Sequence, residues 1–447
     1  MLLVALCGPI SGWAGQADPA LAMRLLKANC LSCHNEDKRK GGLALSSREG
    51  LMAGGDEGVA VVEGKPEESP LIELLSTGAD PHMPPKKQLG AAQIALLREW
   101  VRSGAPWDAA AFTGQSPPRA VSLAPLPASY RPVMALALSP DGTHLAAGCG
   151  HELVLFGIGE GGLVFKAKAH AHLDPVQSIA WLPDSKSLVT GAFRRVVLWE
   201  AQTLTQQREI TSGLTDRITV VLPAPASGRV LVADGSVAEN GVVRELDPAS
   251  GRILRSWPAH DDTIFAMALS RDGKRLATAG GDKLVKLWDP VTGKETARLE
   301  GHTSQVLSLA FHPDGSQLIT GGADRQLKVW DTATRENVIK LPNKGSACNA
   351  LQWNETGPAV FAVMEDGGLM KYTELKSHTG AESSETGQER RIGGAESALY
   401  SMAVNTKGDR LFAGTRDGRI LGWNQDGKLT DDLQASPAPA VTSVTPP

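Results

Sequence analysis

The sequence predicts two folded domains: a small all-α domain over residues 18–107 and an all-β domain of seven repeated units over residues 119–434. In the first part, apolar residues recur at helical spacing. The second part consists of short alternating apolar runs whose starts recur every 41–52 residues. Four short strands in each unit of about 40–45 residues are typical of a β-propeller. The 48 Gly and 28 Pro residues supply the turns that such a domain needs.

The composition and the N-terminal segment limit the classes of function that the protein can have. For a chain of 447 residues, the net charge of −4 is small and argues against a dedicated nucleic-acid binder. No later run of 18 apolar residues occurs, so no transmembrane helix is expected. Residues 1–17 combine an apolar core with small residues near their end, which predicts a secretory signal peptide. Cys7 in this segment is a poor lipidation site, since the preceding Leu6 is large.

The first motif is Cys30-Leu31-Ser32-Cys33-His34. A C-x-x-C-H run is the attachment signature of c-type haem, because two thiols at this spacing reach the two vinyl groups of one porphyrin edge. The imidazole that follows then ligates the iron from one face. At helical spacing, Cys30, Cys33 and His34 share one face. The motif therefore predicts one covalent haem.

Other readings of this motif lack support elsewhere in the sequence. A structural zinc site needs a second pair of ligands, but Cys149 and Cys348 are single and far apart. A thioredoxin-like C-x-x-C belongs in a βαβ context, which the surrounding helical pattern does not provide. Cys149 and Cys348 are expected to be two buried thiols, with a single disulfide as the alternative.

Four helices are expected around the motif. They cover residues 21–28, 46–53, 70–75 and 91–103. Leu21, Leu25 and Ala28 form the apolar stripe of the first helix. Ser46 and Glu49 match a capping box at the start of the second. Ser69 reads as the N-cap of the third, with Pro70 at its first position, and Gly104 with Pro106 ends the fourth.

A second segment, Asp80-Pro-His-Met-Pro-Pro-Lys-Lys87, is suited to the sixth iron position. Pro84 keeps Met83 out of the α region, and the neighbouring prolines stiffen the strip. A thioether opposite His raises the reduction potential, which suits electron transfer. Met83 is therefore the predicted distal ligand, with His82 as ligand or Met83 as mere packing as the alternatives. Basic residues flank both ligand segments at 38–40 and 86–87; they form a solvated surface or steer an acidic partner.

Several separated stretches carry a family resemblance. Residues 40–56, Gly64-Lys-Pro-Glu-Glu-Ser, His82-Met-Pro-Pro and the ending Leu-Arg-Glu-Trp-Val-Arg-Ser-Gly-Ala-Pro-Trp occur in that order. Together they resemble the cytochrome c domain of planctomycete and verrucomicrobial secreted proteins over about residues 20–107. The resemblance implies that Cys30 and Cys33 carry the haem, with His34 proximal and Met83 distal.

After a turn-rich linker at 108–118, the first strand of each unit is expected near Val133, Val176, Ile218, Ile264, Val306, Ala347 and Leu399. Two units have a His followed by an Asp after 22 residues and a Trp after 6 more, and they resemble the WD-repeat family. The resemblance covers about residues 119–434 and implies seven blades with a buried hydrogen-bonded set of structural residues. The set comprises His260, Asp282, Trp288, His302, Ser308, Asp324 and Trp330.

Three further segments have expected roles around the repeats. Residues 120–126 and 428–433 are alternative sources of the strand that closes the ring. Residues 375–391 are a polar insertion in the sixth unit, expected as a surface loop with a docking arm as the alternative. Residues 435–447 have the composition of a disordered tail.

These features predict a periplasmic or secreted c-type cytochrome of a Gram-negative-type bacterium. It transfers single electrons through its haem to an unidentified redox partner, and its propeller is a platform for a protein partner. Among the propeller histidines no H-x-E or H-E-x-x-H spacing stands out, and the sequence contains no G-x-S-x-G, no Walker motif and no dinucleotide-binding fingerprint in which a helix follows the glycine-rich turn. No catalytic residues are therefore expected, and an electron carrier or scaffold is favoured over an enzyme. The alternatives are an oxidoreductase whose propeller holds a second cofactor, and a haem-based redox sensor.

Overall fold

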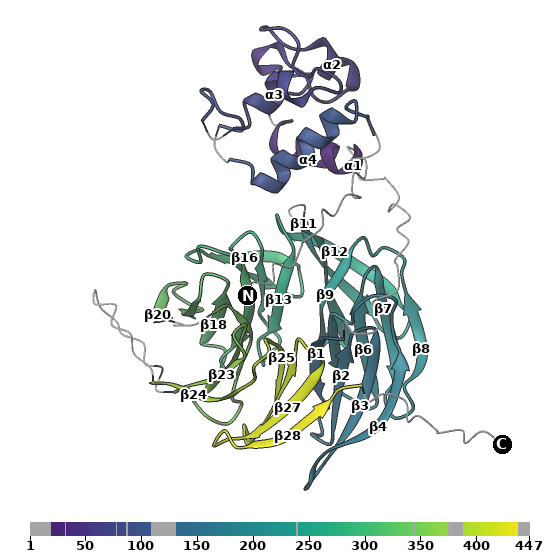
Figure 1. Ribbon diagram of the computed structural model, residues 1–447, viewed down its shortest axis with the longest axis vertical. Helices are drawn as coiled ribbons and strands as arrows, with labels where there is room; N and C mark the ends of the chain where they lie inside the picture. Colours follow the sequence, from purple (N-terminus) through teal and green to yellow (C-terminus); the bar gives the residue numbers. More distant parts are fainter. Residues whose placement is uncertain are drawn as a thin grey trace, which may run out of the picture. The chain divides into compact units, whose positions relative to one another are not determined.

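The computed structural model describes residues 19–31, 33–76, 78–85, 88–108, 131–237, 240–342, 346–373, 375 and 388–436. It divides into two compact units, Met1–Ala120 and Val121–Pro447 (Figure 1). The expected signal peptide, nearly all of the expected linker and residues 437–447 lie outside the described residues. None of the helices that the structure describes is long and apolar enough to cross a membrane; the longest, α4, has 12 residues.

The first unit is helical. Its elements are α1 (Pro19–Asn29), η1 (Lys40–Gly42), α2 (Arg48–Ala53), η2 (Pro66–Glu68), α3 (Pro70–Glu73) and α4 (Ala91–Arg102). The four predicted helices are present, and α3 is two residues shorter than expected. Helix α1 packs against α4, with Met23 and Leu26 of α1 and Leu97 and Trp100 of α4 fully buried in one core. Trp100 also donates its Nε1–H to the Pro106 carbonyl oxygen at 2.9 Å, which ties the chain after α4 to the helix.

Two local predictions in this unit need correction. Helix α2 is capped by Ser47 rather than Ser46, since the Ser47 side chain accepts a hydrogen bond from Gly50 N–H at 3.1 Å. Ser69 does precede α3, but its hydroxyl bonds Val62 N–H and Lys65 carbonyl oxygen instead of capping the helix. The Ser69 hydroxyl therefore connects the chain at Val62 and Lys65, and it does not cap α3 as predicted.

The second unit is a seven-bladed β-propeller, as predicted (Figure 1). Blade 1 consists of β1 (Val133–Leu138), β2 (His144–Cys149), β3 (Glu152–Gly159) and β4 (Gly162–His170). Blade 2 consists of β5 (Ser178–Trp181), β6 (Ser187–Ala192), β7 (Arg195–Glu200) and β8 (Thr205–Ile210). Blade 3 consists of β9 (Arg217–Ala224), β10 (Arg229–Ser236), β11 (Asn240–Asp247) and β12 (Arg252–His260). Blade 4 consists of β13 (Ile264–Leu269), β14 (Leu276–Gly280), β15 (Val285–Asp289) and β16 (Lys294–Leu299).

The last three blades follow the same plan. Blade 5 consists of β17 (Val306–Phe311), β18 (Gln317–Gly322), β19 (Gln326–Asp331) and β20 (Asn337–Pro342). Blade 6 consists of β21 (Cys348–Trp353), β22 (Val360–Met364), β23 (Gly368–Thr373) and β24 (Gln388–Gly394). Blade 7 consists of β25 (Leu399–Val404), β26 (Arg410–Thr415), β27 (Arg419–Asn424) and β28 (Leu429–Gln434). Each blade is an antiparallel sheet of four consecutive strands, and the predicted starts fall within two residues of the observed ones.

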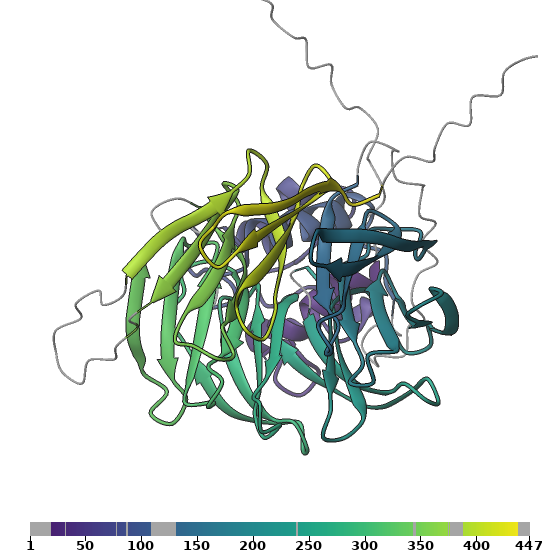
Figure 2. The ribbon, with the colours of Figure 1, turned by 90° about the horizontal axis from the view of Figure 1, so that it is seen from below.

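Among the described strands, the ring closes between blades 1 and 7 by side-by-side packing, and no strand of one blade pairs with the other. Figure 2 shows the last blade in yellow beside the first in dark teal. Segment 429–434 is the outer strand β28 of blade 7, while residues 120–126 lie outside the described residues. Ser401 donates to the Val133 carbonyl oxygen at 3.0 Å, and Arg410 donates to the Gly159 carbonyl oxygen at 2.9 Å. Specific hydrogen bonds therefore connect the two blades although their strands do not pair.

Two boundaries in this unit also differ from expectation. Gln388–Gly394 forms β24, so the last residues of the predicted surface loop belong to a strand; residues 376–387 lie outside the described part. Ala435, placed in the expected tail, is fully buried against blade 1. Cys149 and Cys348 are separate buried thiols, as predicted.

The apolar cores of the propeller lie between blades. Each of seven buried clusters combines residues from two neighbouring blades, and one of them joins blade 7 to blade 1. In that closing cluster, Val133 and Phe156 pack with Phe412 and Ile420. A sheet with two apolar faces must cover both, so each blade depends on both of its neighbours.

Gly393→Ala is expected to destabilise the propeller by about 1–3 kcal/mol through overpacking. A Cβ at this position would lie 2.6 Å from Nε1 of Trp423, a buried side chain of the next blade. Chemical denaturation followed by tryptophan fluorescence measures the loss. Gly161→Ala is the matched control because nothing lies within 4 Å of the added methyl group; equal stability of the two variants would contradict the account.

Candidate functional site

The C-x-x-C-H motif forms a hydrogen-bonded turn directly after α1. Cys30 N–H donates to Leu26 carbonyl oxygen at 2.8 Å, which continues the helical bonding beyond Asn29. Cys33 N–H and His34 N–H both donate to Cys30 carbonyl oxygen, at 3.1 and 3.0 Å. These backbone bonds over three and four residues hold Cys30, Cys33 and His34 in one turn.

This turn is partly buried against the helical core. Cys30 and Leu31 pack on the cluster that contains Trp100. Burial raises the pKa of the Cys30 thiol to about 11, and the neighbouring Cys33 adds to the shift. The backbone of His34 is fixed further, since its carbonyl oxygen accepts from Leu45 N–H at 2.8 Å.

The ring of His34 has an unsatisfied nitrogen. Its Nδ1 is buried and has no hydrogen-bond partner in the described part of the chain. A buried imidazole nitrogen without a partner costs about 1–3 kcal/mol. Two thiols three residues apart and an adjacent imidazole are the donor set that a covalently attached haem requires. The residues present therefore fit that group.

Met83 lies on a separate segment after α3. Its N–H donates to Leu74 carbonyl oxygen at 2.7 Å, and the side chains of His82 and Met83 are both half-buried. Met23 is fully buried in the core and Met52 packs against it, which leaves both with a packing role. Lys38, Arg39 and Lys40 are exposed, and Arg39 pairs with Glu36; Lys86 and Lys87 lie outside the described residues.

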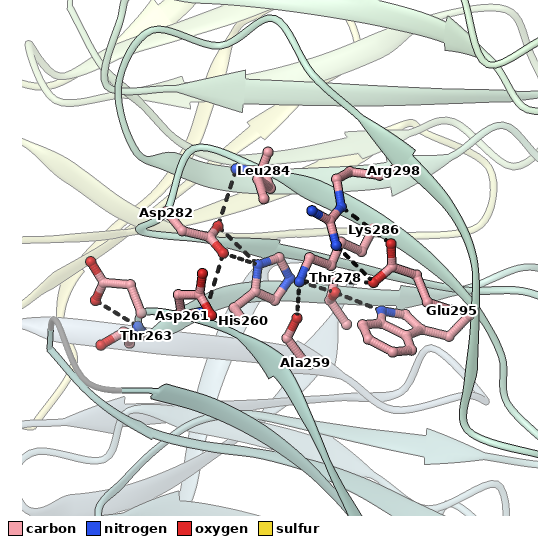
Figure 3. A network of polar contacts seen from close by, with 12 residues as sticks. Ala259, His260, Asp261, Thr263, Thr278, Asp282, Leu284, Lys286, Glu295 and Arg298 are labelled. Carbon is pink, nitrogen blue, oxygen red and sulfur yellow. Dashed lines mark hydrogen bonds and ion pairs between the residues drawn. The ribbon is translucent and has the colours of Figure 1, made fainter. Parts of the chain in front are cut away.

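Blade 4 contains a buried polar network (Figure 3). Trp288 donates its Nε1–H to Thr278 Oγ1 at 2.9 Å, and Thr278 Oγ1 lies 2.7 Å from His260 Nε2. The hydroxyl thus donates to Nε2, which leaves Nδ1–H to donate to Asp282 at 2.9 Å. Burial opposes ionisation of Asp282, but its hydrogen bonds with His260 and with backbone N–H groups outweigh that effect and lower the pKa of its carboxyl. The chain of bonds satisfies every polar atom of the set.

Blade 5 repeats this network and corrects one predicted member. Its participants are His302, Thr320, Asp324 and Trp330. The predicted Ser308 lies outside it, since its hydroxyl donates to Cys348 carbonyl oxygen of blade 6 at 3.1 Å. The reason is geometric: Ser308 is on the innermost strand β17 and faces the next blade, whereas Thr320 on β18 lies between His and Trp.

Blade 2 has a third network that the sequence interpretation missed. His172 Nε2 lies 2.8 Å from Thr190 Oγ1, which accepts from Trp199 Nε1–H at 2.9 Å. Here Nδ1 of His172 is buried without a partner in the described part of the chain, because no carboxylate occupies the Asp position. The signal was the spacing of 18 residues from His to Thr, which blades 2, 4 and 5 share.

Comparison with known proteins agrees with both units. Residues 30–87 match the family model described as Planctomycete cytochrome C, and residues 251–289 and 293–331 match that of the WD domain, G-beta repeat. The chain therefore carries a cytochrome c domain of the planctomycete type before a WD-repeat propeller. No group of three His, Cys, Asp or Glu side chains in the described part is arranged to hold a metal ion.

Curated relatives match the repeats. The chain is 27% identical over 169 residues to WD repeat-containing protein slp1 of Schizosaccharomyces pombe, covering 35% of this chain and 32% of that protein. It is 26% identical over 117 residues to WD repeat-containing protein 3 of Homo sapiens, covering 26% of this chain and 12% of that protein. It is 35% identical over 116 residues to U3 small nucleolar RNA-associated protein 12 of Saccharomyces cerevisiae, covering 25% of this chain and 11% of that protein. The chain thus spans about a third or less of these relatives.

Thr320→Val is expected to lower the free energy of unfolding of the propeller by about 2 kcal/mol or more. The substitution keeps the shape of the side chain but leaves buried nitrogens of His302 and Trp330 without their partner. Calorimetry or denaturant titration measures the change. Thr303→Val is the control, since Thr303 is exposed and contributes only its backbone N–H to Asp324; a loss of the same size there would disprove the role of the network.

His172→Gln is expected to weaken the acid sensitivity of the propeller. Burial lowers the pKa of His172 to about 3, with Arg195 and His170 adding to the shift. An unfolded histidine takes up a proton below about pH 6.5, and the folded one stays neutral. Stability therefore falls as the pH drops from about 6.5 towards 3, by up to ~1.4 kcal/mol per pH unit. Denaturant unfolding curves recorded between about pH 4 and 7 measure this dependence of stability on pH. His144→Gln is the control, since His144 is only half-buried. If the free energy of unfolding of His172→Gln falls with pH as steeply as that of the wild type, the prediction is wrong.

Proposed function

We propose that this chain, in which a cytochrome c domain of the planctomycete type precedes a seven-bladed WD-repeat propeller, is an exported one-electron carrier that docks a protein partner on its propeller. The observation that carries the proposal is the single turn that holds Cys30, Cys33 and His34 together. The two thiols would anchor the haem as thioethers, and His34 would ligate its iron. When bound, the haem supplies a one-electron redox couple.

The residues around this turn favour a carrier with fixed ligands. The bonds from Cys33 and His34 to Cys30 and from Leu45 to His34 restrain the backbone at four positions, which limits rearrangement between oxidation states. Met83 would occupy the sixth position, on a backbone restrained by its bond to Leu74. Sulfur ligation opposite His favours the reduced state and raises the potential, which suits electron transfer.

The propeller would supply the interaction surface. Three of its histidines, His172, His260 and His302, are buried in structural networks and thus are not placed as ligands of a second cofactor. WD-repeat propellers present loops at both ends of their blades, and such loops carry binding residues on a rigid scaffold. Export is proposed from the apolar leader at 1–17 together with the covalent haem motif, since this attachment takes place outside the bacterial cytoplasm.

Met83→Ala is expected to lower the reduction potential by on the order of 0.1 V, within the roughly 0.8 V range that axial ligands set. The full chain is produced with its leader in a host that matures c-type cytochromes, and potential and absorption spectra of the exported protein are recorded. The weak sulfur–iron charge-transfer band should disappear in the variant. His82→Ala is the matched control and should retain both the band and the potential.

Other outcomes separate the alternatives. Loss of the band in His82→Ala rather than in Met83→Ala would move the sixth ligand. The electron-transfer proposal would be wrong if the wild-type chain carried no covalent haem and if Cys30→Ala and Cys33→Ala had the same absorption spectrum as the wild type. Turnover of a substrate by the purified protein would favour an oxidoreductase over a carrier.

A further inference from the structure

Two histidines of blade 1 lie together at the end of an outer strand pair. His151 immediately precedes β3, and His170 is the last residue of β4. The two strands pair antiparallel with Glu152 opposite His170, and His151 carbonyl oxygen accepts from Ala171 N–H at 2.9 Å. The two imidazole rings face each other with centroids 4.7 Å apart and planes at 55°.

The nitrogens of this pair are available. Neither imidazole of His151 and His170 makes a hydrogen bond in the described part of the chain, whereas the rings of His172, His260 and His302 bond to threonine hydroxyls. His151 is half-buried and His170 is exposed, so solvent and solutes reach the pair.

The surrounding charges determine which solute fits. Glu152 pairs with Lys168 at 3.3 Å and with Arg131 at 3.7 Å, and it also accepts from Ser436. The Glu152 carboxylate is thus already paired with two cations, so a hard cation that depends on oxygen ligands is disfavoured. A transition-metal ion of intermediate hardness instead gains its binding energy from nitrogen donors.

We propose that His151 and His170 form a two-histidine site for one divalent transition-metal ion, with Cu²⁺ bound most tightly and water completing the coordination. Two imidazole nitrogens that each bind one ion at about 2.0–2.1 Å lie roughly 3 Å from each other. The ring centroids of His151 and His170 are 4.7 Å apart. Rotation of the two side chains would bring one nitrogen of each ring to that separation. Imidazole sites follow the order in which Cu²⁺ exceeds Ni²⁺ and Zn²⁺. The site is independent of the haem motif, which lies in the other unit.

Occupation of the site would link the start of β3 to the end of β4. Glu152 beside it also contacts Arg131 and Ser436, the two ends of the described propeller chain. An ion that binds the folded form alone raises the unfolding temperature. Metal binding should therefore stabilise the propeller near its closure between blades 7 and 1.

The test is a Cu²⁺ titration of the tag-free, haem-loaded full chain by isothermal calorimetry. One equivalent should bind, with weaker binding of Ni²⁺ and Zn²⁺ and none of Mg²⁺, while the haem absorption stays unchanged. His151→Ala and His170→Ala should each weaken Cu²⁺ binding at least tenfold, because even the loss of a group that only hydrogen-bonds a metal ligand weakens metal binding about 10–100-fold. Electron paramagnetic resonance should show coupling of copper to nitrogen in the wild type that diminishes in both variants.

His144→Ala is the matched control, because His144 lies on the same blade without a second imidazole beside it. His170→Ala alters only an exposed side chain, so it tests the site even if His151→Ala folds poorly. Wild-type affinity in both His151→Ala and His170→Ala would overturn the proposal. An equal loss in His144→Ala would overturn it too, since it would show non-specific histidine binding.

Discussion

The propeller depends on one constraint: a four-stranded blade has two apolar faces and cannot bury either alone. The structure meets it with seven shared cores, one at each contact between neighbouring blades. The last of these joins Phe156 of blade 1 to Phe412 of blade 7. Because each blade is made of consecutive strands, ring closure rests on this core and on bonds such as that from Ser401 to Val133. A closed ring gives every blade a neighbour on each of its two faces.

The polar networks are secondary to this packing, and they vary accordingly. Blades 4 and 5 have the complete chain from Trp through Thr and His to Asp. Blade 2 lacks the carboxylate, and blade 3 replaces the network with Asp234, which accepts from Thr215 N–H and Asp216 N–H and pairs with Arg244. Every blade nevertheless keeps four strands, which shows that apolar burial specifies the repeat while the networks fix its loops.

Apolar packing leaves a strong pattern in the sequence and the polar networks leave a weak one, which explains what the sequence could and could not predict. Apolar alternation located the first strand of every blade within two residues, because burial on both faces leaves a strong periodic signal. The cap at Ser47 was misplaced by one residue, since neighbouring serines offer the same chemistry and only backbone phase selects between them. Thr320 and His172 were missed because their bonds cross strands, and partner identity depends on register rather than on local composition. The position of Met83 relative to the haem turn depends on tertiary packing in the same way.

Histidine illustrates how surroundings assign chemistry to one residue type. In blades 4 and 5 both ring nitrogens are bonded, to a threonine and an aspartate, so His260 and His302 have no capacity left for a ligand. His34 keeps a buried nitrogen without a partner beside two thiols, an arrangement that a covalent cofactor would justify. The rings of His151 and His170 make no hydrogen bond in the described part of the chain, and their centroids lie 4.7 Å apart. His172, whose Nδ1 also lacks a partner, belongs to the structural group through its contact with Thr190. The groups beside each ring therefore separate the structural histidines from those that we propose as ligands of a cofactor or a metal ion.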